Sequence, residues 1–257
     1  MTSIATPSPA AIETRQLRKS FGAFVVTSDV DFRLEHGARH ALIGPNGAGK
    51  TTFVNLVSGA LTPTSGTVAL NGIDVTSLTQ AQRVKRGLVR TFQINQLFRK
   101  LTVLENVGLA VTERQGLAGN VWRPAGSNQA ALDEAYALLE RVGLASDAMR
   151  VIADLPYGRQ RMTEIAVALG LNPKVLLLDE PAAGVPTGDV GLIIDLIEQL
   201  PADISVMLIE HDMAIVFRVA KRITVLTEGH VLIEGTPAEI AQNPKVREVY
   251  LGERKPL

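Results

Sequence analysis

Residues 44–51, GPNGAGKT, have the residue types and the spacing of a phosphate-binding loop. The loop follows the apolar run HALI and precedes TTFVNLVSGA, whose pattern favours a helix. Glycines let backbone N–H groups surround phosphate oxygens, and the start of the helix adds a positive dipole end. We therefore predict a nucleotide site formed by Gly44, Pro45, Asn46, Gly47, Ala48, Gly49, Lys50, Thr51 and Thr52.

Four side chains are expected to act on the bound phosphates. Lys50 would bridge the β- and γ-phosphates, and the Thr51 hydroxyl would bind Mg²⁺. The apolar run VLLL leads into Asp179 and Glu180, and strand alternation sends their side chains in different directions. Asp179 would reach the Mg²⁺ shell while Glu180 polarises the attacking water. An isolated acidic pair would instead suggest a solvated turn, and the loop upstream favours the catalytic role.

His211 stands just after another apolar run, ISVMLI. It is therefore expected at the carboxyl edge of the sheet, where open α/β proteins bind ligands. A lone histidine is usually structural, but this one is placed to contact a γ-phosphate. The other three, His36, His40 and His230, occur in strand or turn contexts and are interpreted as structural.

The segment 155–161, LPYGRQR, has the features of a helix start. Pro156 suits an entry turn, and Gly158 permits close backbone approach. Apolar residues then recur at helical spacing, which predicts a buried face: Met162, Ile165, Ala166 and Leu169. The first turn would present free N–H groups to an anion, so we expect the backbone amides near Tyr157 and Gly158 to make that contact.

The rest of the chain predicts the elements that hold these residues. Short β-rich pieces over residues 12–75 are separated by Gly, Asn and Asp, which favours antiparallel strands and hairpins. Residues 101–143 have helical periodicity, with Leu132, Ala135, Tyr136 and Leu139 on one face and Gly143 as a stop. From residue 174 onward, apolar strands alternate with helices, as in a parallel sheet buried on both faces.

Composition narrows the functional classes. The chain has 257 residues, 46% of them apolar, and this length can bury a large core. Lys plus Arg equals Asp plus Glu at 26 each, so no overall positive field draws the protein to nucleic acid, and we expect no nucleic-acid partner. The absence of cysteine excludes thiolate metal sites and a cysteine nucleophile. No apolar run is long enough to span a bilayer, and residues 1–11 are interpreted as a flexible tail.

Together these residues resemble the ATP-binding subunit of an ABC transporter over residues 12–253. GPNGAGKT resembles the Walker A motif of that family, VLLLDE its Walker B motif and His211 its switch histidine. Gln93, in TFQ, corresponds to the Q-loop glutamine, and Phe21 to the aromatic residue that stacks on adenine. LPYGRQR occupies the position of the LSGGQ signature, 21 residues separating Gly158 from Asp179.

The resemblance implies an α/β fold, with a P-loop NTPase core, an antiparallel β subdomain and a helical subdomain inserted over about residues 95–170. It also implies a head-to-tail dimer with two ATP molecules between two ATP-binding subunits, each held by one P-loop and the partner's signature helix. Gln93 would link Mg²⁺ and the attacking water to the helical subdomain. Catalysis would thus involve Glu180, His211 and Gln93, and the metal would contact Thr51, Gln93 and Asp179.

Membrane partners follow from the same resemblance. Two permease subunits would dock on residues 94–107, where Arg99 and Lys100 stand among apolar residues, although an ordinary solvated turn explains any single residue there equally well. A periplasmic solute-binding protein would act indirectly. The subunit would then be peripheral, at the cytoplasmic face of the bacterial inner membrane.

The closest motif pattern is that of the branched-chain amino-acid importers. LPYGRQR, DEPAAG, LIEHDM and the closing NPKVREVYLGE carry this resemblance. Importers of urea or other small solutes, a lipopolysaccharide-export ATPase and a non-hydrolysing regulatory module remain alternatives. Pro156 replaces the signature serine, and Pro186 stands at the position of the D-loop aspartate, with Asp189 three residues on. Another type of P-loop enzyme would lack LPYGRQR, and a GTPase would need an NKxD motif, which is absent.

Overall fold

Two sheets form the centre of the protein. The computed structural model describes residues 9–91, 97–117 and 128–251. The smaller sheet is antiparallel, in the order β2 (Phe24–Leu34), β1 (Ile12–Phe21), β4 (Ser65–Leu70) and β5 (Ile73–Asp74). The larger sheet has the order β10 (His230–Gly235), β9 (Arg222–Thr227), β3 (Arg39–Ile43), β8 (Ser205–Ile209), β7 (Val175–Asp179) and β6 (Leu88–Arg90). Within it β10 pairs antiparallel with β9, and the other pairs are parallel.

The larger sheet is buried on both faces, which explains the unbroken apolar runs in its strands. In β7, Leu176 and Leu178 belong to one hydrophobic cluster, while Val175 and Leu177 belong to the other. Strands β3 and β8 divide their residues between the two clusters in the same alternating way. The parallel sheet predicted from the sequence is therefore confirmed.

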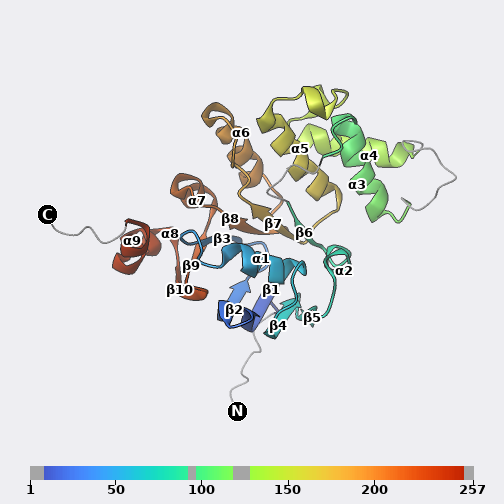
Figure 1. The fold of residues 1–257 in the computed structure, drawn as a ribbon. Helices are drawn as coiled ribbons and strands as arrows, with labels where there is room; N and C mark the ends of the chain where they lie inside the picture. Colours follow the sequence, from blue (N-terminus) through green and yellow to red (C-terminus); the bar gives the residue numbers. More distant parts are fainter. Residues whose placement is uncertain (1–8, 92–96, 118–127, 252–257) are drawn as a thin grey trace, which may run out of the picture.

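Helices surround this sheet and also form a separate group. They are α1 (Lys50–Ser58), α2 (Gln80–Val84), α3 (Val103–Arg114), α4 (Gln129–Arg141), α5 (Tyr157–Gly170), α6 (Thr187–Glu198), α7 (Met213–Val219), α8 (Pro237–Gln242) and α9 (Pro244–Leu251), with short 3₁₀ turns at Ala145–Asp147 and Ile152–Asp154. Helices α3, α4 and α5 lie between β6 and β7 in the chain, and they gather at one end of the molecule, away from the antiparallel sheet (Figure 1). No helix in the described ranges is long and apolar enough to cross a membrane.

Local sequence signals account for many element ends. Helices α2, α3 and α8 begin with complete capping boxes, in which a threonine side chain accepts from the N3 backbone and the N3 side chain accepts from the threonine backbone. Gly143 follows α4 with φ 71°, so it is the predicted stop. The β9–β10 hairpin turns at Glu228 and Gly229, both with positive φ, as a two-residue turn of this type requires.

Two features differ from the sequence predictions. Tyr136 was expected on the buried face of α4 but is 42% exposed, because Ala131, Ala135 and Leu139 form that face. The apolar stripe is thus rotated by one position from the predicted one. Ala10 and Ala11 were assigned to a flexible tail, yet both are buried, and the Ala11 carbonyl accepts a hydrogen bond from the Asn71 N–H. Ordered packing therefore begins before β1.

Candidate active site

The predicted motifs follow strands that end at the same edge of the larger sheet. Asp179, the last residue of β7, is paired with Ile209 at the end of β8, and Ile209 is paired with Leu42 near the end of β3. Arg90, at the end of β6, is paired with Leu177 of β7. Because these strands are parallel, the connections that leave their carboxyl ends meet at one edge. The adjacency of β3, β7 and β8 brings the P-loop, the acidic pair and the histidine turn together.

The P-loop, residues 44–52, has a backbone that requires glycine. Gly49 has φ 94°, and a Cβ added there would lie 2.7 Å from the Val26 carbonyl oxygen. At Gly44 an added Cβ would lie 2.2 Å from the Leu226 carbonyl oxygen. Helix α1 begins directly after Gly49, and no side chain caps it. Its first N–H groups and its positive dipole end are therefore available to an anion.

Lys50 lies over the P-loop. Its Nζ donates to the carbonyl oxygens of Gly44 at 2.5 Å and Pro45 at 3.0 Å. Burial lowers the pKa of Lys50, while the negative charges of Glu180 and Asp179 oppose that shift. These two carboxylates therefore lie close enough to the lysine for their charges to act on it, as a shared phosphate site requires.

Asp179 makes a buried ion pair that sequence reasoning missed. Its Oδ2 accepts from Arg90 Nη2 at 2.5 Å, and the two side chains are 7% and 9% exposed. Arg90 Nη1 also donates to Asn55 Oδ1 of α1 at 2.6 Å. One guanidinium thus connects β6, the acidic strand β7 and the helix that follows the P-loop. The basic residue three positions before Gln93 was the available signal.

Glu180 and His211 face each other across neighbouring connections. The Nδ1 atom of His211 lies 3.7 Å from Glu180 Oε1, and the histidine side chain is 65% exposed. Glu180 has φ 46°, which turns it out of the strand direction of Asp179. Its N–H donates to the Ile209 carbonyl at 2.9 Å. The pair is therefore supported by backbone contacts between the ends of β7 and β8.

Glu210 is a second residue that sequence reasoning missed. It is 1% exposed, and its carboxylate accepts from the N–H groups of Ala182 at 3.3 Å and His211 at 3.2 Å. Burial raises its pKa, and these backbone hydrogen bonds, together with one from Asp212, oppose that shift. An acidic residue immediately after the apolar run of β8 was the only signal in the sequence.

The signature segment opens helix α5 and packs against the turn after the acidic pair. Pro156 precedes the helix and provides no side-chain cap. An added Cβ at Gly158 would lie 3.0 Å from the Cβ of Asp189, and one at Gly184 would lie 3.2 Å from the Tyr157 ring. Tyr157 and Gly158 therefore contact residues of their own chain, and the α5 N-terminus carries free N–H groups.

Two predicted residues are not brought into this group by the described contacts. Phe21 ends strand β1 in the antiparallel sheet, is 51% exposed and has Lys19 Nζ 5.2 Å from its ring centroid. An exposed ring is available for stacking on a base, but no contact in the described residues tests that role. Gln93 lies outside the described residues.

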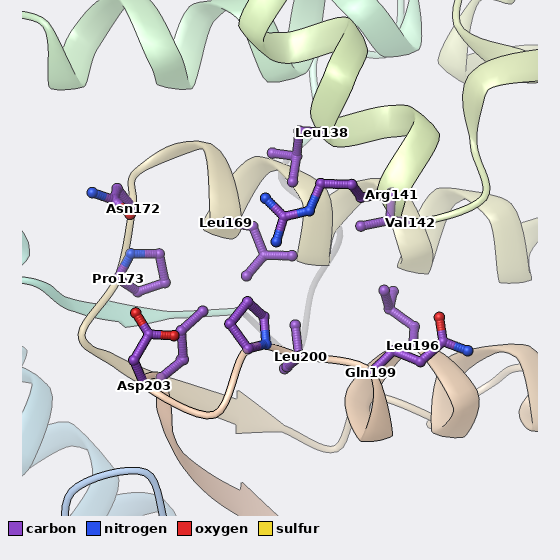
Figure 2. Close-up of a pocket in the computed structure, with 12 residues that line it drawn as sticks. Leu138, Arg141, Val142, Leu169, Asn172, Pro173, Leu196, Gln199, Leu200 and Asp203 are labelled. Carbon is purple, nitrogen blue, oxygen red and sulfur yellow. The ribbon is translucent and has the colours of Figure 1, made fainter.

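A pocket of about 250 Å³ lies outside this site, and Figure 2 shows the residues that line it. Its walls come from the ends of α4 and α5 and from the α6–β8 connection, and they include Arg141, Leu169, Gln199 and Asp203. Pro173 and Ile204, which also line it, stand just before β7 and β8. The pocket therefore lies at the amino-terminal edge of the parallel strands, opposite the edge where such sheets bind ligands.

Comparisons with known proteins match this arrangement. A family model described as ABC transporter matches residues 27–183, and one described as branched-chain amino acid ATP-binding cassette transporter matches residues 230–256. The chain is 40% identical to the high-affinity branched-chain amino acid transport ATP-binding protein LivG of Salmonella typhimurium, over 92% of this chain and 96% of LivG. It is 37% identical to BraF of Pseudomonas aeruginosa, also named a high-affinity branched-chain amino acid transport ATP-binding protein, over 94% of this chain and 98% of BraF.

Solved structures agree with the sequence relatives. A nucleotide-free ATP-binding cassette from an ABC transporter has a TM-score of 0.84 and 30% identity, covering 95% of this chain and all of that chain. A dimeric bacterial ABC transporter cassette has a TM-score of 0.73 and 25% identity, covering 88% and 98%. The fold, the motif positions and the matches over most of the length agree. The chain therefore belongs to the ABC transporter family, as an ATP-binding cassette.

Proposed function

We propose that the protein is the ATP-hydrolysing subunit of an importer for branched-chain or other hydrophobic amino acids. The observation that carries the ATPase assignment is the meeting of the P-loop, Asp179, Glu180 and His211 at one sheet edge. The substrate class is supported by the names of LivG and BraF and by the match over residues 230–256. The solute itself would be selected by membrane partners and a solute-binding protein.

The P-loop would bind the triphosphate. Backbone N–H groups at the start of α1 would donate to phosphate oxygens, and Lys50 would exchange its carbonyl partners for the β- and γ-phosphates. Thr51, which is exposed at the first turn of α1, and Asp179 would be the oxygen donors for Mg²⁺. When bound, this ion neutralises negative charge on the phosphates. Magnesium sites of this kind use one or two protein side chains plus the nucleotide, which fits the residues present.

Glu180 would orient and polarise the attacking water. Its carboxylate accepts a hydrogen bond from water placed in line with the γ-phosphate, and His211 contacts that phosphate from the neighbouring connection. Gln93 would complete the water and metal contacts, and Phe21 would stack on the adenine. The left-handed backbone of Glu180 gives its side chain a direction different from that of Asp179.

A second copy of the cassette, or a related one, would complete each site. The free N–H groups at Tyr157 and Gly158 would contact the γ-phosphate held by the partner subunit, because Pro156 has no hydroxyl to do so. The dimeric structure of a related cassette supports such an assembly. Two permease subunits would dock on the α3 side, where Arg99 and Lys100 are exposed, and hold the protein peripherally at the cytoplasmic face of the inner membrane.

The Glu180→Gln variant tests the hydrolytic role. We expect phosphate release to fall about 100-fold or more, because an amide is a poor acceptor for the water proton, while ATP binding persists. The ATP-bound dimer should accumulate and appear as a larger species in size-exclusion chromatography. Glu198→Gln, a change of an exposed acid paired with Arg218, is the matched control and should turn over normally. Unchanged hydrolysis in Glu180→Gln would refute the assigned role.

Substrate class needs a separate measurement. The native complex, purified from membranes through this subunit, should contain a hydrophobic permease pair. After reconstitution in vesicles, it should transport leucine, isoleucine or valine in an ATP-dependent manner. ATP-driven uptake of urea without uptake of these amino acids would overturn the proposed substrate.

A further inference from the structure

Glu210 joins the two turns that carry the catalytic side chains. Its Oε1 accepts from the Ala182 N–H, two residues after Glu180, and its Oε2 accepts from the His211 N–H. Glu210 and Ala182 are 28 positions apart in the chain. The carboxylate therefore bridges the turn after β7 and the turn after β8.

Burial of this carboxylate is not explained by an ordinary ion pair. Among the described residues, no lysine or arginine nitrogen lies within 4.0 Å of the Glu210 carboxylate, and the nearby ring nitrogen is His211 Nδ1, 3.9 Å from Oε2. A buried acid without a strong cation is costly and needs hydrogen bonds to its oxygens. The backbone donors from the two turns supply them.

The backbone conformation of Glu180 depends on contacts of this kind. A non-glycine residue with φ 46° is held in a sparsely populated conformation, which persists only where neighbouring contacts over-determine it. One such contact is the Glu180 N–H to the Ile209 carbonyl, and the next along the turn is Ala182 to Glu210. Both anchors are provided by the end of β8, the strand that also positions His211.

We propose that Glu210 is a positioning residue for ATP hydrolysis, which holds the Glu180 turn and the His211 turn in one fixed arrangement. This inference rests on the proposed roles of Glu180 and His211. The Glu210 carboxylate is buried and hydrogen-bonded to backbone, and it lies 3.9 Å from His211 Nδ1, beyond hydrogen-bond distance. Its effect on the reaction passes through the placement of the other two side chains.

The test uses Glu210→Gln, which keeps the shape of the side chain and places an NH₂ group against one backbone donor. We expect kcat to fall about 10-fold to 100-fold, because misplacement of a reacting group by about 1 Å has effects of this size. The KM for MgATP should stay within about twofold of the wild-type value, since the P-loop is untouched. Glu198→Gln again serves as the matched acid-to-amide control.

Coupling to His211 separates positioning from general stability. Hydrolysis is measured for the single variants Glu210→Gln and His211→Ala and for the double variant. In the His211→Ala background, Glu210→Gln should cost less than about threefold, because residues that act as a unit have non-additive effects. A full multiplicative loss in the double variant, or a wild-type kcat in Glu210→Gln, would overturn the proposal.

Two further measurements keep the result interpretable. If Glu210→Gln is not folded, Glu210→Asp, which keeps the charge on a shorter side chain, is assayed in its place. The expected result is the same: a lower kcat and a KM close to that of the wild type. The Glu180→Gln variant is assayed in parallel. If it remains active, the proposed site is wrong whatever Glu210 does; if it is inactive while Glu210→Gln and Glu210→Asp behave as wild type, the positioning role alone is wrong.

Discussion

Helices α1, α5 and α6 begin without a side-chain cap, whereas α2, α3 and α8 begin with complete capping boxes. Capping boxes satisfy the first N–H groups within the chain, so those three helix starts have no need of a ligand. The starts of α1 and α5 leave their N–H groups to an outside acceptor. The start of α6, after Pro186, is also uncapped, so a missing cap alone does not mark a nucleotide site. What distinguishes α1 and α5 is that they begin in the P-loop and in the signature segment.

The starts of α1 and α5 also differ from each other. The N-terminus of α1 directly follows the P-loop, and Lys50, the first residue of this helix, adds a positive charge at the expected phosphate position. In the first turns of α5 the arginine side chains bind groups of their own chain. Arg159 donates to the Gly143 carbonyl, and Arg161 pairs with Glu164 at 2.6 Å. The P-loop is therefore complete in one chain, while α5 offers backbone groups alone and is half of a proposed shared site. Four predictions compare these helix starts with residues that support the fold.

Removal of the lysine should have the largest effect. Lys50→Ala is expected to weaken MgATP binding about 100-fold, because charge-assisted contacts to the phosphates are lost. Isothermal titration of the purified chain measures this. Lys221→Ala, a change of an exposed lysine outside the site, is the control. Retained affinity in Lys50→Ala would show that the P-loop is not the nucleotide site.

A methyl group at the start of α5 should reduce hydrolysis without affecting binding to the P-loop. Gly158→Ala places a Cβ 3.0 Å from the Asp189 side chain, so the helix start or that side chain must move by a few tenths of an ångström, and we expect a loss of about tenfold in kcat. Gly191→Ala in α6 meets nothing within 4 Å and is the matched control. Equal hydrolysis in the two variants, or loss of ATP affinity in Gly158→Ala, would contradict the assignment of α5 to the partner's site.

Acid should destabilise the strand that leads into the P-loop. His40 of β3 is buried, and its Nε2 lies 2.8 Å from Thr224 Oγ1. Burial lowers its pKa to about 4; the charge of Glu234 opposes this shift, and the charge of Arg222 adds to it. In the unfolded chain this histidine takes up a proton near pH 6.5, so below that pH the unfolded state binds more protons and stability falls as pH falls. Between pH 7 and pH 5 the loss should be about 2 kcal/mol.

Urea unfolding at the two pH values measures this effect. His40→Gln should show a smaller loss on acidification than the wild type, because its side chain does not titrate. His230→Gln, at an exposed position, should keep the wild-type response. An unchanged pH response in His40→Gln would contradict the neutral, buried state of His40.

Loss of a capping box should have the smallest effect and should leave the nucleotide site intact. Thr102→Ala removes the side-chain acceptor at the start of α3 and is expected to lower the free energy of unfolding by about 1 kcal/mol. Thr102→Ser retains the hydroxyl and should be close to wild type. ATP affinity should not change in either variant. A change in ATP affinity would mean that capped helices also contribute to the site.

Much of the local structure could be predicted. The P-loop with its strand and helix, the buried run of β7 and the Gly143 stop after α4 are all visible as residue patterns. Tyr136 was mispredicted because a residue of mixed character fits both the edge of an apolar stripe and the surface. Its side chain faces solvent because the neighbouring alanines already form the buried face.

Arg90 and Glu210 could not be predicted in their roles. Arg90 pairs with a carboxylate 89 positions away, and Glu210 binds an amide 28 positions away. Each contact depends on which strands are neighbours and on their register. In the sequence, both residues are single charges at the end of an apolar run, a pattern that is equally typical of a solvated turn.

The sequence by itself determined many local features of this protein: glycines at Gly44 and Gly49, where φ is positive, apolar runs where a strand is buried, and a lysine and two acids suited to phosphate chemistry. Only the tertiary structure decided which strand ends, with the residues that follow them, lie side by side. The physical reason is that local preferences act over a few residues, whereas the order β3, β8, β7 and β6 is set by burial of both faces of a single sheet. That order placed Arg90 on Asp179 and Glu210 between the turns of Glu180 and His211.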